Sequence, residues 1–219
     1  QKKYWNNSGV RRYYIDRYFE KKEYDRVLQV LDESIELDKA YRGQVLEYNQ
    51  KKKEIYRLQG NKSAYIEQLW KLVLEQSAGD LDIYKELKAQ YSEKEWLIKR
   101  EELFKKLPAN AHIDRLYKEE KLYDRLLAYV LKSSGLYAVQ SYENVLKKEY
   151  PKQILSKYQD EVNKMASCTG NRKHYADLVA LLRRMKQIKG GSEIVETIVE
   201  EWKIKYRNRP AMMDELSKL

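Results

Sequence analysis

The chain contains little of what disulfide-bonded, membrane-spanning or β-rich proteins are built from. Its 219 residues include one Cys, two His, three Pro and eight Gly. A single cysteine cannot close an internal disulfide, which predicts a reducing, cytoplasmic compartment. No apolar run approaches the roughly 18–20 residues of a membrane span, and no signal peptide is recognisable. The scarcity of glycine and proline argues against a β-sandwich, long loops or disorder.

The common catalytic and metal-binding patterns are also missing. A zinc site needs four Cys or His ligands, or about three plus water when it is catalytic. Cys168 and His174 lie close in sequence but have no further ligand beside them, and nothing marks a base for Cys168 as a nucleophile. The glycines are too dispersed for a loop that cradles phosphate. We therefore expect no enzymatic activity, no cofactor, no metal site and no small-molecule substrate.

Charge and tyrosine are what the sequence has in quantity. Charged residues make up 36% of the chain, the formal net charge is +10, and 20 residues are Tyr. Basic and acidic residues interleave, as in residues 118–121, which is typical of solvated helix faces. Tyrosine fills space between helices while its hydroxyl stays near water, which suits thin helical layers.

Apolar residues recur at helical spacing nearly throughout, and no segment shows the period-2 alternation of a strand. The cleanest stripe consists of Tyr175, Leu178, Val179, Leu182 and Met185. Short breaks separate the periodic segments and predict eleven to thirteen helices. The predicted breaks lie at 60–61, 79–80, 107–110, 133–135, 150–151, 169–171 and 189–192. Asn61, Asp80, Asn171 and Ser192 are expected as N-caps, and Pro151 and Pro210 in first turns.

One stretch of the chain is duplicated. Residues 17–28 and 115–127 share the sequence Tyr-Asp-Arg, which begins at Tyr24 in the first copy and at Tyr123 in the second. A repeated helix–turn–helix unit indicates a helical array, because no unit buries its apolar face alone. The aromatic positions recur at uneven intervals, so the units are degenerate. We predict an all-α, TPR-like α-α superhelix (α-solenoid) of antiparallel helix pairs, one domain over 1–219 with a secondary boundary near 168–171.

The most suggestive charged surface is C-terminal. Residues 172–209 hold ten basic and five acidic side chains. The residues that we expect to contact a partner are Arg183, Arg184, Lys186, Arg207 and Arg209. Such a ridge could hold phosphates without reading a base sequence. Cations near helix C-termini also complement the helix dipole, so both interpretations stay open.

The same region resembles a known family. Residues 174–185 lead through Gly190-Gly191 to a helix that ends in Trp202 and the segment 206–216, Tyr-Arg-Asn-Arg-Pro-Ala-Met-Met-Asp-Glu-Leu. This is similar to the helical C-terminal region of bacterial SWIM zinc-finger proteins. The resemblance implies a zinc finger with Cys-x-Cys and Cys-x-His pairs further upstream. Neither pair occurs here, so the zinc site is not carried over, and the chain, which starts at Gln1, is expected to be the C-terminal part of a larger protein.

These observations predict a non-enzymatic helical-repeat scaffold that mediates protein–protein interaction. A protein or peptide segment would lie along its concave face, held by aromatic and basic side chains, since Tyr, Trp and Arg dominate such contacts. The alternative is a nucleic-acid-associated module that uses the C-terminal basic ridge. Binding that weakens steeply as salt rises would favour the alternative.

Overall fold

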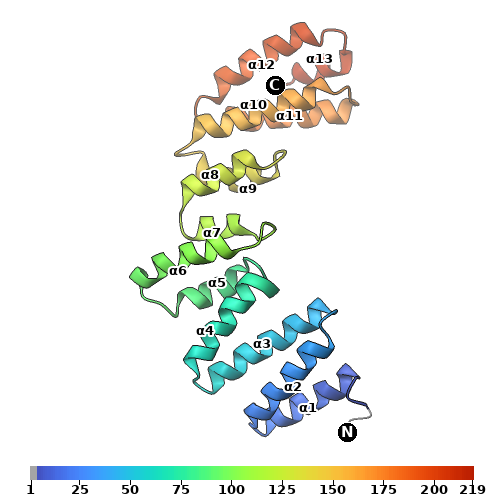
Figure 1. The fold of residues 1–219 in the computed structure, drawn as a ribbon. Helices are drawn as coiled ribbons and strands as arrows, with labels where there is room; N and C mark the ends of the chain where they lie inside the picture. The colour runs from blue at the N-terminus through green and yellow to red at the C-terminus, as the bar shows by residue number, and fades with distance from the viewer. Residues whose placement is uncertain (1–3) are drawn as a thin grey trace. The chain divides into compact units, whose positions relative to one another are not determined.

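The structure is a computed structural model that describes residues 4–219 (Figure 1). Over this range the chain is all-helical, with thirteen α-helices, one short π-helix and no strand. The all-α prediction and the predicted number of helices are therefore confirmed. The superhelical arrangement of the helix pairs stays a prediction.

The chain divides into two compact units, one ending at Glu120 and the other starting at Lys121. The first unit comprises α1 (Ser8–Glu20), α2 (Tyr24–Leu37), α3 (Arg42–Leu58), α4 (Lys62–Lys71), the π-helix η2 (Leu72–Gln76), α5 (Leu81–Lys88), α6 (Glu93–Lys106) and α7 (Ile113–Glu119). The second comprises α8 (Tyr123–Lys132), α9 (Tyr137–Leu146), α10 (Pro151–Ser167), α11 (Arg172–Lys186), α12 (Gly191–Lys205) and α13 (Pro210–Leu216). The secondary boundary predicted near 168–171 coincides with the α10–α11 connection inside the second unit.

Helices that follow one another in sequence pack together within each unit. In the first unit α1 contacts α2, α2 contacts α3, and α3 contacts α4; in the second, α8 to α12 form the same kind of series. The helix α13 turns back against α11. The predicted stripe on α11 is confirmed, because all five of its residues from Tyr175 to Met185 are buried.

Apolar clusters lie between these helices. One cluster in the first unit joins α1, α2 and α3, and a second joins α4 to α7. The first cluster contains Ile15, Val27, Val30, Leu31, Tyr48 and Ile55, and the second contains Leu69, Leu72, Val73, Ile83, Tyr84, Leu87, Trp96, Leu103 and Leu116. The second unit buries Val130, Leu146, Leu155, Tyr158, Leu178, Leu182, Ile198 and Trp202.

Most of the predicted helix ends are confirmed. The side chains of Asn61, Asp80 and Asn171 accept hydrogen bonds from backbone N–H groups in the first turns of α4, α5 and α11. Pro151 and Pro210 are the first residues of α10 and α13.

One predicted cap is wrong. Ser192 does not cap α12, because the helix already starts at Gly191, and Gly190 precedes it with a positive φ of 83°. The backbone of Gly191 lies so close to the carbonyl of Met185 that a Cβ atom there would come within 1.8 Å of the oxygen. This tertiary contact determines where α12 begins, and the local sequence does not predict it.

The two copies of the Tyr-Asp-Arg stretch share an unusual backbone. Tyr24 is the first residue of α2, and Tyr123 is the first residue of α8. Two positions before each tyrosine a lysine has a left-handed conformation, with φ of 58° at Lys22 and 55° at Lys121. No other non-glycine residue between 4 and 219 has positive φ. The two copies therefore form the same turn, not only the same sequence.

Buried carboxylates link the helices. Glu120, which follows α7, accepts hydrogen bonds from Tyr84 Oη at 3.0 Å, Lys88 Nζ at 2.8 Å and Trp96 Nε1 at 3.1 Å. Its second oxygen accepts from Arg100 Nη1 at 3.2 Å. Burial alone would raise the pKa of Glu120, but the hydrogen bonds outweigh it and hold the pKa below its ordinary value. A single carboxylate thus joins α5 and α6 to the end of α7.

Candidate functional site

The predicted partner contacts all lie in the second unit, and most of them make intramolecular contacts. Arg184 Nε donates to Glu143 Oε2 at 2.6 Å, and Tyr158 Oη donates to the same oxygen at 2.6 Å. Glu143 is 5% exposed, so these bonds tie α9, α10 and α11 around a buried charge. Burial and the Glu143 carboxylate raise the pKa of Tyr158, and the hydrogen bond to Glu143 raises the pKa of Arg184. Arg184 therefore has a structural role in the second unit.

Arg209 caps the end of a helix. Its Nη1 donates to the carbonyl oxygens of Ala166 at 2.7 Å and Cys168 at 3.3 Å, where α10 ends. Its guanidinium carbon lies 4.4 Å from the ring centroid of Tyr206. A cation at a helix C-terminus satisfies free carbonyls and complements the dipole. Arg209 therefore caps the C-terminal end of α10, and its role in binding a partner stays a prediction.

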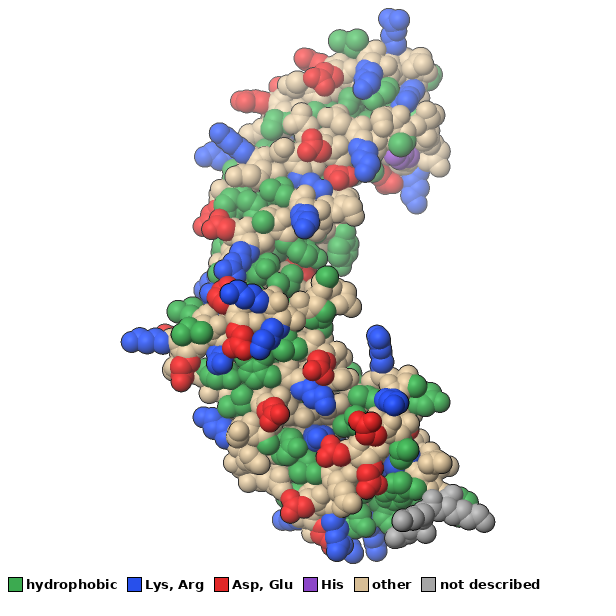
Figure 2. Space-filling model, in the orientation of Figure 1, with side chains coloured by type: hydrophobic (Ala, Val, Ile, Leu, Met, Phe, Trp, Pro, Cys, Tyr) green, Lys and Arg blue, Asp and Glu red, His purple; other side chains and the backbone are tan. Residues whose placement is uncertain are grey.

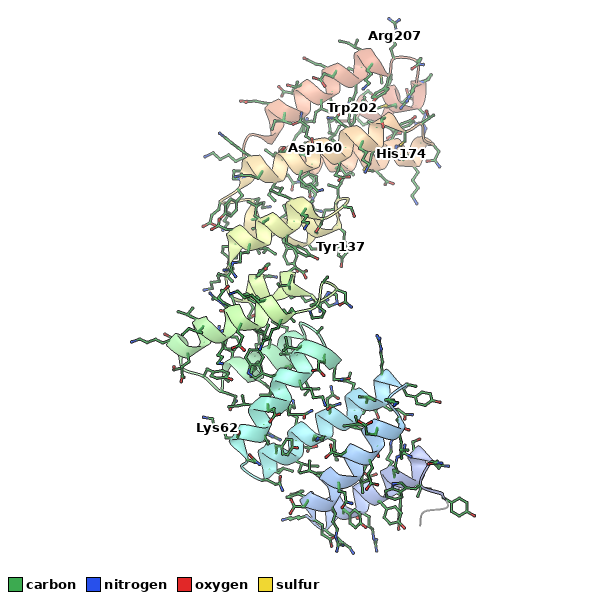
Figure 3. All side chains as sticks on the ribbon, viewed as in Figure 1. Lys62, Tyr137, Asp160, His174, Trp202 and Arg207 are labelled. Atoms are coloured by element: carbon green, nitrogen blue, oxygen red, sulfur yellow. The ribbon has the colours of Figure 1, made fainter. Side chains whose placement is uncertain are left out.

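Of the other three predicted contact residues, two make hydrogen bonds within the described part of the chain and one does not. Arg183 Nη2 donates to the carbonyl of Lys218 at 2.6 Å, and Lys186 Nζ donates to that of Leu219 at 3.5 Å. Arg207 is exposed and makes no hydrogen bond or ion pair with the described residues; its side chain extends away from the helices at the end of α12 (Figure 3). A role of these residues in binding a partner stays a prediction.

The described residues hold neither a group of metal ligands nor a membrane-spanning helix. No three His, Cys, Asp or Glu side chains between 4 and 219 lie where they could share a metal ion. His174 Nε2 lies 3.1 Å from the carbonyl oxygen of Met165, and Cys168 is an exposed thiol. Over the same range, none of the helices combines the length and the apolar character that crossing a bilayer requires.

A cleft of about 800 Å³ opens on the first unit, and no local pattern in the sequence indicates it. Its walls come from the α2–α3 connection, the start of α3, the π-helix with the loop after it, the α6–α7 connection and α7. The lining residues are Lys39, Arg42, Val45, Leu74, Glu75, Gln76, Ser77, Ala78, Gly79, Asp80, Pro108, Asn110, His112 and Arg115. Cavities of this size accommodate a drug-sized ligand or several residues of a peptide.

A π-helical turn and a tight loop form one wall of the cleft. The N–H of Ser77 donates to the carbonyl of Leu72 at 2.8 Å, a bond that spans five residues and is characteristic of a π-turn. Gly79 is buried with φ of 75°, and a Cβ atom there would lie 2.9 Å from the backbone nitrogen of His112. The left-handed conformation favours glycine, and the close approach leaves no room for a side chain. The loop at 77–80 is thus held directly against the α6–α7 connection.

The cations of the cleft are available to a ligand. Lys39, Arg42 and Arg115 are exposed, and none makes a hydrogen bond or ion pair within the described chain. On the acidic side, one oxygen of Asp80 accepts hydrogen bonds from the N–H groups of Asp82 and Ile83, both at 3.0 Å. The carboxylate of Asp80 is therefore already used as a cap.

An exposed aromatic side chain accompanies these cations. Tyr41 immediately precedes Arg42 and is 64% exposed, and Leu37, the last residue of α2, is 48% exposed. Exposed tyrosine beside arginine is the composition that contributes most to protein–protein contacts. Over the face shown in Figure 2, by contrast, Lys and Arg side chains are interspersed with Asp and Glu.

The comparisons with known proteins offer no guide to the site. No family model matches the chain, and neither a curated protein nor a solved structure matches it. A functional assignment therefore rests on the geometry of the cleft and on the chemistry of the residues that line it.

Proposed function

We propose that the chain is a non-enzymatic helical scaffold for protein–protein interaction, and that a segment of the partner lies in the cleft of the first unit. The observation that carries this proposal is a cleft of about 800 Å³ with three unpaired cations on its walls. Three separate stretches of the chain, residues 39–45, 74–80 and 108–115, contribute to it, so its shape depends on the packed helices and not on one loop alone.

The finer fold assignment belongs to the same proposal. Helices packed in sequence order within each unit are compatible with a TPR-like α-α superhelix, in which stacked pairs offer an extended binding surface. The resemblance of residues 172–219 to the helical region of SWIM zinc-finger proteins also fits a partner-docking role for this chain.

Nucleic-acid binding through the C-terminal ridge has less support. Four of the five ridge residues donate hydrogen bonds to carbonyls or carboxylates of the second unit. A cation that is hydrogen-bonded within its own protein contributes less binding free energy to a phosphate contact, because the internal hydrogen bond must be weakened first. A salt titration with labelled DNA and RNA tests this alternative.

Selection from a random peptide display library, with the purified chain as bait, tests the docking proposal. Ala78 and Asn110 line the cleft, so the substitutions Ala78→Trp and Asn110→Trp each place a large side chain into it. Ala128 is exposed on α8 of the second unit, and Ala128→Trp serves as the matched control. We expect the selected peptides to lose binding to the two cleft variants and to keep it with the control.

Circular dichroism and thermal unfolding establish that each variant is folded before binding is compared. One folded cleft variant is enough for the comparison with the control. A library that yields no enriched peptide contradicts the proposal. Peptides that bind the folded cleft variants as well as the natural chain contradict it equally.

A further inference from the structure

We infer that the cleft selects an acidic peptide, one that carries several carboxylates beside an apolar residue. This inference rests on the proposed docking function and specifies the chemistry of the partner. It starts from a contrast within the first unit, where many cations are already neutralised. Lys52 pairs with Asp32 at 2.5 Å, and Lys53 pairs with Glu86 at 2.6 Å.

The cations of the cleft have no such partners. Lys39, Arg42 and Arg115 come from the α2–α3 connection, the start of α3 and α7, and each has its charge free among the described residues. Three cations that line one concavity repel one another, and a concave surface with low-dielectric walls strengthens their field. An anionic ligand relieves this repulsion, so the cleft is electrostatically complementary to acidic groups.

Two carboxylates on the walls restrict where those acidic groups can lie. The carboxylate of Asp80 is turned to the first turn of α5, where it accepts two backbone hydrogen bonds. Glu75, on the π-helix, is exposed and repels an acid placed next to it. Acidic residues of the ligand should therefore lie toward Lys39, Arg42 and Arg115 and away from Glu75, which gives the bound segment a direction.

The size of the cleft favours several carboxylates over a single phosphoryl group. At about 800 Å³ it is far larger than one such group, and its cations stand on three different elements. An arginine binds a carboxylate through two parallel hydrogen bonds, so Arg42 and Arg115 can each hold a separate one. Leu74 and Pro108 line the same cleft and offer an apolar contact for a neighbouring ligand side chain.

Fluorescence anisotropy with a labelled peptide that alternates Glu and Leu tests the inference. Two comparison peptides have the same design with Gln or Lys in place of Glu. We expect the acidic peptide to bind and the other two to bind at least about tenfold more weakly, with an affinity that falls as salt rises. Charge reversal by Lys39→Glu, Arg42→Glu or Arg115→Glu should weaken binding by about tenfold each.

Lys94 is exposed on α6 and does not line the cleft, so Lys94→Glu controls for a change in net charge alone. Equal binding of the three peptides, or equal loss with Lys94→Glu, overturns the inference. A labelled oligonucleotide whose binding depends on Lys39 and Arg42, when the acidic peptide fails to bind, overturns it in favour of a phosphate ligand.

The docking proposal and the acidic inference can fail separately. If display selects neutral or basic peptides that Ala78→Trp excludes, the cleft is a docking site, and the inference of an acidic partner is wrong. If display selects no peptide and the acidic probe does not bind, both are wrong.

Discussion

Arg11 in α1 and Asp38 at the end of α2 form an ion pair inside the first unit. The distance from Arg11 Nη2 to Asp38 Oδ2 is 2.5 Å, the arginine side chain is fully buried, and the aspartate is 8% exposed. Tyr48 from α3 donates to the same oxygen at 2.7 Å, so three helices meet at one carboxylate. The pair is therefore a point where loss of one residue affects the packing of the others.

Loss of the buried arginine should be costly. Arg11→Ala leaves the Asp38 carboxylate without its cation in a poorly solvated place. Removing one partner of a buried pair typically costs about 3–5 kcal/mol, and we expect a loss in this range in the free energy of unfolding of the first unit. Urea denaturation followed by tryptophan fluorescence measures it, since Trp5, Trp70 and Trp96 all lie in this unit.

The neighbouring arginine provides a matched control. Arg12 pairs with Glu47 at 3.0 Å, but the two side chains are 56% and 63% exposed. Surface pairs of this kind contribute at most about 1 kcal/mol, so Arg12→Ala should change stability little. Equal losses for the two variants would contradict the assignment of Arg11 to the core.

Glu120 should make the first unit sensitive to acid. Its pKa is held below the ordinary value of 4.5 by hydrogen bonds from Lys88, Trp96 and Tyr84, despite its burial. A carboxyl group whose pKa is lower in the folded state stabilises the fold while it is ionised in both states. That stabilisation is complete above the unfolded pKa and is lost as pH falls through the folded pKa, from about pH 5 downward.

Glu120→Gln removes the titrating group and keeps its shape. We expect the variant to be about 1–3 kcal/mol less stable at neutral pH and to lose less further stability between about pH 5 and 3 than the natural chain does. The control is Glu119→Gln, because Glu119 is 33% exposed and pairs with Lys85 at 3.3 Å. An unchanged acid profile for Glu120→Gln would show that other carboxylates dominate acid unfolding.

Helix boundaries were largely predictable because local sequence determines them. Asn61, Asp80 and Asn171 cap helices through bonds to N–H groups no more than three positions away. The start of α12 was not predictable from local sequence. It depends on the contact between Gly191 and Met185. By contrast, a serine that follows two glycines predicts an N-cap at Ser192.

The candidate site was less predictable, for a related reason. Helical periodicity places Arg184 off the apolar stripe, but it cannot reveal that Glu143, 41 positions earlier, lies opposite. The cleft draws on residues from Lys39 to Arg115, and only the packed helices bring them together. In the sequence, Gly79-Asp80 and residues 107–110 indicate only breaks between helices. The free cations could be recognised only once their surroundings were known.

Arg184 and Arg207 should differ in what their removal does to the second unit. Arg184→Ala deprives the buried Glu143 of a 2.6 Å hydrogen bond, although Tyr158 still donates to it and Lys147 lies 3.6 Å away. Because Arg184 is 37% exposed, water reduces the loss, and we expect about 1–2 kcal/mol.

Arg207→Ala should change stability by less than about 0.5 kcal/mol, as expected for an exposed residue without partners among the described residues. Native-state amide hydrogen exchange in the helices of the second unit measures the free energy of opening for both variants. A larger loss for Arg207→Ala than for Arg184→Ala would mean that the ridge residues have been assigned the wrong roles.

Gly79 and Gly43 should respond in opposite directions to the same substitution. Gly79 has φ of 75°, and a Cβ atom would lie 2.9 Å from the backbone nitrogen of His112, so Ala fits neither the conformation nor the space. The left-handed conformation alone costs an alanine about 1–2 kcal/mol, and the clash adds to it. Gly43 lies in the first turn of α3, and no atom lies within 4 Å of the place that a methyl group would occupy. There Ala should stabilise the chain by about 0.4–1 kcal/mol, because it restricts the unfolded chain and favours the helix.

Because the two substitutions should change stability in opposite directions, together they test the close packing of the cleft wall. Gly79→Ala must push the loop at 77–80 away from the α6–α7 connection, and these two segments line the same cleft. We therefore expect the variant to bind the acidic Glu-Leu peptide more weakly as well as to unfold at lower urea concentration, whereas Gly43→Ala should bind normally. If Gly79→Ala were as stable as the natural chain, the two loops could not be in the close contact that shapes the cleft, and the proposed binding site would lose its structural basis.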